Sequence, residues 1–162
     1  MKLDTERLWA EVTAYFGDDT RRIEHARSVL GYAREILADE NADRDTVEAA
    51  AMLHDIGIHE AERKYNSTAG HHQELEGPPI ARDILAGMGA DEALIEHVCR
   101  IIASHHSPGE VETPEFFVLW DADWLVNIPD EYPDAGVEKL SSIVDKVFRT
   151  KKGRELANRF LI

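Results

Sequence analysis

The sequence predicts an all-α fold in one domain. Apolar residues recur at spacings of three and four through successive segments, which is typical of helices that bury one face. No segment shows the alternation of strands and helices that builds a parallel sheet, and the sequence contains no internal repeat. With 162 residues, 43% of them hydrophobic and 31% charged, the chain can bury a substantial core.

Two helices are expected before residue 38. Asp4 or Thr5 can cap the first, which Gly17 would end, and residues 18–20 begin a second, longer helix. The second helix carries an apolar stripe, and His25 lies close to the same face. The stripe consists of Ile23, Val29, Leu30, Ala33, Ile36 and Leu37. The polar stretch 38–44 is expected to be a loop.

The third helix is expected to end in a histidine and an aspartate. Asp45 with Glu48 resembles a capping box at its start. Residues 49–57 read Ala-Ala-Ala-Met-Leu-His-Asp-Ile-Gly, which places His54 and Asp55 at the closing end of an apolar run. Burying both polar side chains is costly unless something binds them. We therefore expect a metal ion as their partner.

Further helices complete the chain. Residues 59–65 suit a short exposed helix, and Pro78 or Pro79 suits the first turn of the next one. A helix from Asp91 arrives at Ser104-His105-His106. Another opens at residues 113–115 and leads into Asp121-Ala122-Asp123. A turn around Pro129 and Pro133 precedes two closing helices, expected over 137–148 and 153–161.

Charge and composition exclude several classes of partner. The net charge of -14 argues against a nucleic-acid polymer and against an anionic membrane surface, since both need basic patches. A single cysteine, Cys99, excludes an internal disulfide and a cysteine-rich zinc site. No apolar run approaches ~20 residues, and the first residues lack a signal-peptide pattern. A cytoplasmic protein is the resulting expectation.

The histidines gather at helix ends. Five of the eight histidines fall in three clusters, His54-Asp55, His71-His72 and His105-His106, and each cluster lies near the end of an expected helix or in a loop beside one. This distribution suggests that several helix ends converge on one site. Neutral imidazoles with carboxylates suit Mn, Fe, Co, Ni or Zn, whereas Mg prefers oxygen ligands.

At this point the residues resemble a known family. The segments HARSVL, VEAAAMLHDIG, EGPPIARDIL, IIASHH and LWDADWL occur in the order seen in small bacterial members of the HD-domain superfamily of metal-dependent phosphohydrolases. The resemblance implies a single compact helical HD domain over residues 1–162, with a metal site between helices. Its core would span about 18–128, and C-terminal helices at 135–162 would pack on that core.

The resemblance also implies a ligand set. His25, His54, Asp55 and Asp123 match the four metal ligands of the family. Asp121 competes with Asp123 for the last place, but two carboxylates at i and i+2 on a helix point in different directions. We choose Asp123 as the ligand and expect Asp121 to orient a histidine.

A second ion depends on further histidines. His105 and His106 match the later ligand positions of family members that bind two ions, but Gln73 stands where an earlier histidine is expected. His72, one residue away, could substitute only if the loop shifts. We therefore expect one firmly held ion, with a second ion left open.

The implied reaction is hydrolysis of a phosphoester or phosphoanhydride by metal-activated water. Asp55 would act both as ligand and as acceptor of the nucleophile's proton. Arg22, three residues before His25, would bind a phosphate, and His106 would protonate the leaving oxygen. The expected substrate is a small phosphorylated metabolite such as a nucleotide.

Two other functions stay open at this stage. One is an HD-type di-iron oxygenase, and the other is a non-catalytic regulatory domain that binds a ligand. A homo-oligomer is also left open by the sequence.

Overall fold

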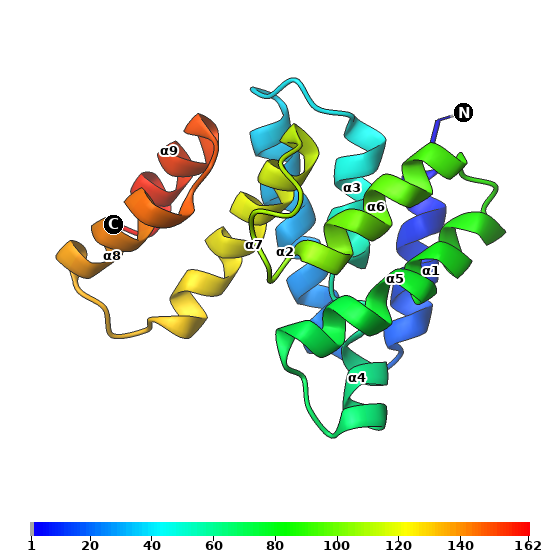
Figure 1. Ribbon diagram of the computed structural model, residues 1–162. Helices are drawn as coiled ribbons and strands as arrows, with labels where there is room; N and C mark the ends of the chain where they lie inside the picture. Colours follow the sequence, from blue (N-terminus) through cyan, green and yellow to red (C-terminus); the bar gives the residue numbers. More distant parts are fainter. Residues whose placement is uncertain (1) are drawn as a thin grey trace.

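The computed structural model describes residues 2–162, and these residues form nine helices (Figure 1). The helices are α1 (Thr5–Phe16), α2 (Thr20–Leu37), α3 (Arg44–Leu53), α4 (Ile58–Tyr65), α5 (Gly70–Gly87), α6 (Glu92–Ser104), α7 (Pro114–Glu131), α8 (Val137–Val147) and α9 (Lys151–Phe160). The all-α prediction is confirmed. Within residues 2–162, no helix combines the length and the apolar character that a membrane crossing requires.

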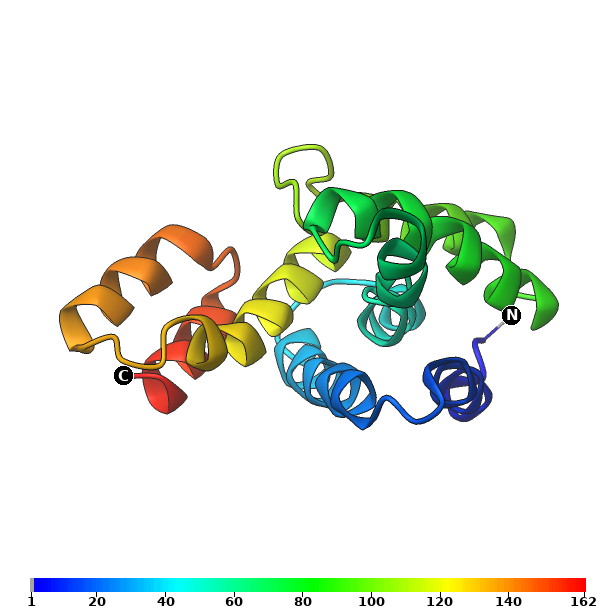
Figure 2. The same cartoon turned by 90° about the horizontal axis from the view of Figure 1, so that it is seen from below.

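Helix α3 lies at the centre of the molecule. Every residue from Thr46 to Leu53 is buried, and α3 contacts α1, α2, α6 and α7. Viewed from below, it lies between α1 and α2 on one side and α5 and α6 on the other (Figure 2). The three alanines at 49–51 have no exposed surface, and their small side chains allow neighbouring helices to approach closely. The central position of α3 places the residues that follow it, His54 and Asp55, inside the helical bundle.

The start of α3 differs from the expected capping box. Asp43 caps the helix, because its carboxylate accepts hydrogen bonds from the Thr46 backbone N–H at 3.0 Å and from the Thr46 hydroxyl at 2.6 Å. Asp45 instead accepts a hydrogen bond from the backbone N–H of Leu3. Glu48 is buried and forms ion pairs with Arg34 and Arg44. The expected capping box is therefore not formed, because Asp45 binds the backbone of Leu3 and Glu48 pairs with two arginines.

Helix α5 begins earlier than the prolines predicted. It starts at Gly70 and contains Pro78 and Pro79 in its interior, although each proline removes a backbone hydrogen bond of the helix. The helix packs along α6 and α4, and its backbone approaches residue 57 so closely that a Cβ on Gly57 would lie 2.5 Å from the Gly77 nitrogen. Tertiary packing thus outweighs the local cost of the prolines. As a consequence, residues 71–73 lie in the first turn of a helix.

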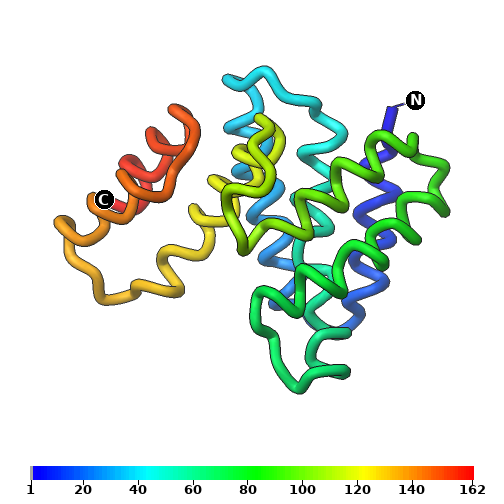
Figure 3. The backbone as a smooth tube through the Cα atoms, in the orientation of Figure 1, coloured from blue at the N-terminus to red at the C-terminus, as the bar shows by residue number. Residues whose placement is uncertain are grey.

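Helix α7 connects the bundle to a C-terminal helical pair. It packs on α2 and α3, while α9 packs on α7 and α8 packs on α9. The backbone trace shows α8 and α9 beyond α7, at the opposite end of the molecule from the N-terminus (Figure 3). The indole N–H of Trp120 on α7 donates a hydrogen bond to the Val147 carbonyl at the end of α8.

Asp121 connects α7 to the start of α9 by hydrogen bonds. The expectation that it orients a histidine is therefore wrong. The side chain has no exposed surface. Its Oδ1 accepts a hydrogen bond from the Arg149 backbone N–H at 2.9 Å, and its Oδ2 accepts from the Thr150 N–H at 2.7 Å and from the Thr150 hydroxyl at 2.6 Å. The same hydroxyl accepts a hydrogen bond from the Gly153 N–H and so caps α9. The two aspartates of the 121–123 segment therefore serve different parts of the structure.

We predict that Gly153→Ala destabilises the protein by about 1–3 kcal/mol, because the new Cβ would lie 2.3 Å from the Asp121 Oδ2 and force this junction apart. Gly31→Ala is the matched control. Gly31 also lies within a helix, and its added Cβ meets no atom within 4 Å, so we expect stabilisation by about 0.5–1 kcal/mol. Urea unfolding of both variants measures the difference, and equal midpoints would contradict the role of this junction.

Candidate metal centre

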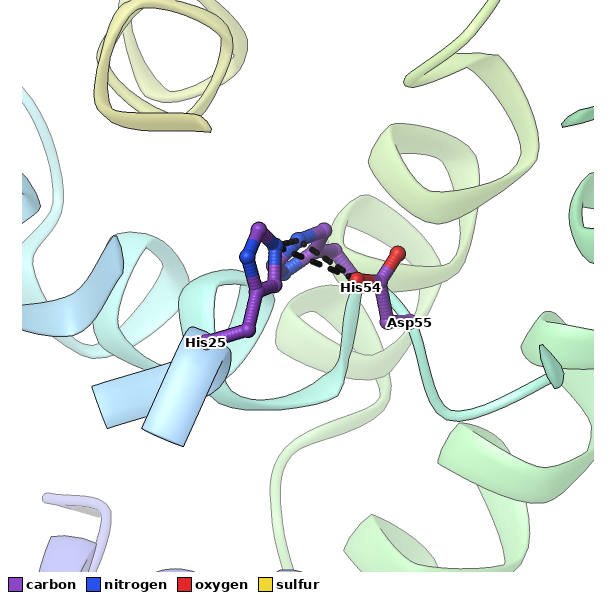
Figure 4. A group of neighbouring side chains, drawn as sticks. All are labelled: His25, His54 and Asp55. Atoms are coloured by element: carbon purple, nitrogen blue, oxygen red, sulfur yellow. Dashed lines mark hydrogen bonds and ion pairs between the residues drawn. The ribbon is translucent and has the colours of Figure 1, made fainter. Parts of the chain in front are cut away.

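The candidate metal ligands come from four separate parts of the bundle. His25 lies within α2, His54 is the residue that closes α3, and Asp55 follows it. Figure 4 shows the side chains of these three residues pointing toward one another. Asp123 lies within α7, and His105 closes α6. The expectation that helix ends converge therefore holds for the ends of α3 and α6, whereas His25 and Asp123 come from within helices and the His71-His72 cluster does not take part.

Four side chains meet at spacings typical of ligands around one ion. The Nε2 atom of His25 lies 3.2 Å from His54 Nε2, from Asp55 Oδ2 and from Asp123 Oδ1. The His54 Nε2 lies 3.4 Å from Asp55 Oδ2 and 3.3 Å from Asp123 Oδ1. With metal–ligand bonds of about 2.1 Å, adjacent ligands lie about 3.0 Å apart in an octahedron and about 3.4 Å apart in a tetrahedron. The observed spacings span this range.

Backbone carbonyls orient two of the imidazoles. The Nδ1–H of His54 donates to the Ala51 carbonyl at 2.9 Å, and the Nδ1–H of His105 donates to the Ile102 carbonyl at 2.7 Å. A ring that carries its proton on Nδ1 presents an unprotonated Nε2 to a cation. The Nε2 of His105 is buried without a hydrogen-bond partner and lies 3.6 Å from Asp55 Oδ1. A buried acceptor of this kind fits a bound cation.

A second group of ligand atoms adjoins the first. Atoms of Asp55, His105 and His106 lie within 4.8 Å of one another, as do those of His25, His54 and Asp55. The two groups share Asp55, whose two oxygens face different histidines. This second group consists of residues that could hold the second ion that the sequence left open.

The carboxylates of Asp55 and Asp123 decide the direction in which the pKa values of His25 and His54 shift. Burial alone lowers the pKa of His25, but hydrogen bonds to Asp123 and Asp55 outweigh it and raise that pKa to about 10. The pKa of His54 is also raised, since the charges of Asp55 and Asp123 outweigh its burial. Although burial opposes it, the neighbouring histidines hold the pKa of Asp55 and that of Asp123 below the usual range. The site therefore favours positive charge beside two ionised carboxylates.

His106 has a different environment. Burial and the neighbouring His105 lower its pKa to about 4. Its Nε2 lies 3.3 Å from the Gln73 Oε1, and the Gln73 amide donates to the Thr68 carbonyl at 2.6 Å. Gln73, which stands where a ligand histidine was expected, therefore holds His106 by a hydrogen bond.

His72 is not brought to this centre, which corrects its place among the expected ligands. Its ring stacks on Tyr65, with ring centroids 4.1 Å apart and the planes at 12°. Neither group of convergent ligand atoms includes it. The reason is the early start of α5, which places consecutive residues on different sides of a helix: Gln73 turns toward His106, and His72 turns toward α4.

A cavity of about 380 Å³ opens onto the centre. His25, Asp55 and Asp123 line it together with Arg21 and Arg22 of α2. Sequence reasoning singled out Arg22 but missed the contribution of α7 beyond Asp123. Asn127, Asp130 and Glu131 also line the cavity. Their signal was present in the sequence, because residues four, seven and eight positions after Asp123 share its helix face.

We predict that uptake of a divalent ion releases protons and tightens as pH rises. The raised pKa of His25 means that its protonated form stabilises the metal-free fold below about pH 6.5, and that this contribution is lost as pH rises toward 10. An ion needs the neutral ring and must displace that proton. Calorimetric titration with Zn²⁺ between pH 6 and 8.5, in pairs of buffers that differ in ionisation enthalpy, measures the protons released. Identical heats in paired buffers would show that no proton leaves.

Comparison with known proteins identifies the family and a related fold. The family model of the HD domain matches residues 22–145. The fold resembles the crystal structure of a predicted HD superfamily hydrolase from an uncultured Thermotogales bacterium. The TM-score is 0.69 and the sequence identity 26%, over 95% of this chain and 83% of that one. No curated protein gives a significant match. The chain therefore belongs to the HD-domain superfamily, a family of metal-dependent hydrolases.

Proposed function

We propose that the protein is a phosphohydrolase that cleaves a phosphoester or phosphoanhydride of a small metabolite such as a nucleotide. The observation that carries the proposal is the cavity that Arg21 and Arg22 line together with His25, Asp55 and Asp123 of the candidate metal centre. Guanidinium groups bind phosphoryl oxygens in a planar, two-pronged geometry. A volume of about 380 Å³ suits a small molecule.

We assign a separate role in the reaction to each group of residues at the centre. When bound, a divalent ion would supply an activated water and neutralise phosphoryl oxygens. His25, His54, Asp55 and Asp123 would hold the ion, as the spacing of their ligand atoms allows. Asp55 borders both ligand groups and would accept the proton of the nucleophile.

Arg22 would bind the phosphate. Its backbone N–H donates to the Asp19 carboxylate that caps α2, which fixes the first turn of the helix. Its side chain lines the cavity beside His25, one helical turn further on. Fixing the backbone next to the ion reduces the conformational freedom lost when the guanidinium binds phosphate.

His106 was expected either to bind metal or to protonate the leaving oxygen. With its pKa lowered to about 4, the neutral ring prevails near pH 7. A neutral ring can bind a metal but has no proton to give beyond its ordinary N–H. We therefore favour His106 as a ligand of a second ion, beside Asp55 and His105.

One observation also supports the oxygenase alternative. Two ligand groups that share Asp55 could hold the pair of irons that such an enzyme needs. The arginines of the cavity favour a phosphorylated substrate instead. Two irons per chain with absorption in the visible region would support the oxygenase, and phosphate release with Mn, Co or Ni would support the hydrolase. A regulatory role would be supported if no metal produced turnover while a ligand still bound.

We predict that the metal-loaded protein releases phosphate from members of a panel of nucleotides and sugar phosphates, and that chelation abolishes the activity. His54→Ala should lower metal content in elemental analysis and reduce kcat/KM about a hundredfold or more. His71→Ala is the matched control, because this exposed histidine lies outside both ligand groups. Activity that survives both chelation and His54→Ala would refute the proposal.

Removal of the Arg22 side chain should weaken substrate binding. For Arg22→Ala we expect kcat/KM to fall by about ten- to a hundredfold with a raised KM, the loss typical of a charge-assisted hydrogen bond. Arg22→Lys should recover part of the loss, since it restores charge but not the planar geometry. Arg100→Ala, an exposed arginine on α6, serves as control. Steady-state kinetics unaffected by Arg22→Ala would remove this residue from the site.

A further inference from the structure

A second cavity, of about 110 Å³, continues from the candidate metal centre along α7. Its α7 wall includes Trp120, Trp124, Asn127 and Glu131, and we call the cavity the tryptophan recess. The recess shares His106, Asp123, Asn127 and Glu131 with the larger cavity. The two cavities therefore adjoin each other beside the candidate ligands.

The recess follows from helix geometry. The four α7 residues Trp120, Trp124, Asn127 and Glu131 are spaced four, three and four positions apart, which places them on one face of the helix. Asp123 lies next to Trp124 in sequence and opens onto both cavities. A group bound in the recess would consequently lie directly beside the metal centre.

The aromatic wall of the recess is held in place. The Trp120 ring lies 5.9 Å from the Phe116 ring at an interplanar angle of 29°, and its indole N–H donates to the Val147 carbonyl at 3.0 Å. The Trp124 ring follows, with its centroid 6.1 Å from that of Trp120. Fixed rings of this kind offer a flat apolar surface at a low entropic cost of binding.

The charge differs between the two cavities. Arg21 and Arg22 line only the larger one, on its α2 side. Glu131 and Asn127 of α7 line both cavities, and none of the described residues that line the recess is a lysine or an arginine. An anionic group would thus be attracted at the α2 side and repelled at the recess.

We propose that the tryptophan recess binds the organic end of the substrate, and that this end is a flat ring that carries hydrogen-bond donors and no second anionic group. The proposal rests on the proposed phosphohydrolase function and extends it to the substrate class. The ring would stack on Trp124, while Asn127 and Glu131 would accept its N–H or O–H donors. A cavity of about 150 Å³ takes up benzene in another protein. The recess, at about 110 Å³, is smaller, so one ring would extend partly from it into the adjoining cavity.

Two aryl phosphates test the charge requirement. 4-Aminophenyl phosphate and 4-carboxyphenyl phosphate share the ring and the phosphate, but only the first carries a donor in place of an anion. The carboxylated phenol is the better leaving group, so intrinsic reactivity opposes the preference that we predict. We expect kcat/KM to favour the amino compound about tenfold, and Glu131→Gln to reduce this preference while Glu138→Gln on α8 does not. Equal rates, or a preference for the carboxylate, would overturn the proposal.

Glycerol 3-phosphate, which has no ring, tests the stacking surface. Trp124→Ala should reduce kcat/KM for 4-aminophenyl phosphate about tenfold more than for glycerol 3-phosphate. Trp124→Phe should restore most of the difference, since it keeps a flat ring. Trp9→Phe on α1 is the control for loss of an indole elsewhere. Equal losses for both substrates would show that Trp124 supports the fold and does not contact the ring.

A binding measurement separates failure of this proposal from failure of the proposed function. In nitrogen-15 NMR spectra of zinc-loaded protein, 4-aminophenol should shift the indole N–H signals of Trp120 and Trp124 more than that of Trp9. 4-Hydroxybenzoate should shift them less. If no member of the nucleotide and sugar-phosphate panel and no aryl phosphate is hydrolysed with any metal, the phosphohydrolase function fails, yet these shifts still report whether the recess binds such a ring. If hydrolysis occurs and the shifts are absent or equal for the three indoles, the recess proposal fails.

Discussion

The structure depends on two carboxylates, Asp55 and Asp123, that are held among imidazoles inside a helical bundle. Ionised carboxylates in such a place destabilise the fold unless positive charge balances them. In the described structure the histidines supply that balance, which is why the pKa of His25 rises to about 10. A divalent ion would supply it more fully and would free the imidazoles to act as neutral ligands. Metal binding and stability of the bundle are therefore linked through the same four side chains.

The central helix α3 explains how these side chains meet. Because α3 is surrounded by α1, α2, α6 and α7, the residues at its end emerge where α2 and α7 also pass. Its buried alanines permit this close packing. Hydrogen bonds to backbone carbonyls then orient His54 and His105, so the secondary structure that builds the core also directs their Nε2 atoms toward the centre.

Three residues of helix α7 contact three different parts of the structure. Asp121 binds the start of α9, Asp123 faces the candidate metal centre, and Trp124 lines the recess beside it. Neighbouring positions on a helix point in different directions, so one short segment can contribute to stability, ligand binding and substrate recognition. The C-terminal helical pair thus contacts the same helix that carries the site. At this junction Gly153 packs against Asp121 and Thr150, and Asp121 lies two residues along α7 from the candidate ligand Asp123.

The sequence by itself determined the helical class, because helix periodicity is a local property of the linear chain. The group of His25, His54, Asp55 and Asp123 was implied by the resemblance to the HD-domain family, whose short motifs are likewise read from the linear chain. Only the tertiary structure decided the start of α5, where close packing of Gly57 on Gly77 outweighs the helix-breaking tendency of two prolines. It also decided that Asp121 binds Thr150, that Gln73 holds His106, and that His72 stacks on Tyr65. These contacts join residues whose separation in space depends on how whole helices pack, and no local pattern in the chain encodes that distance.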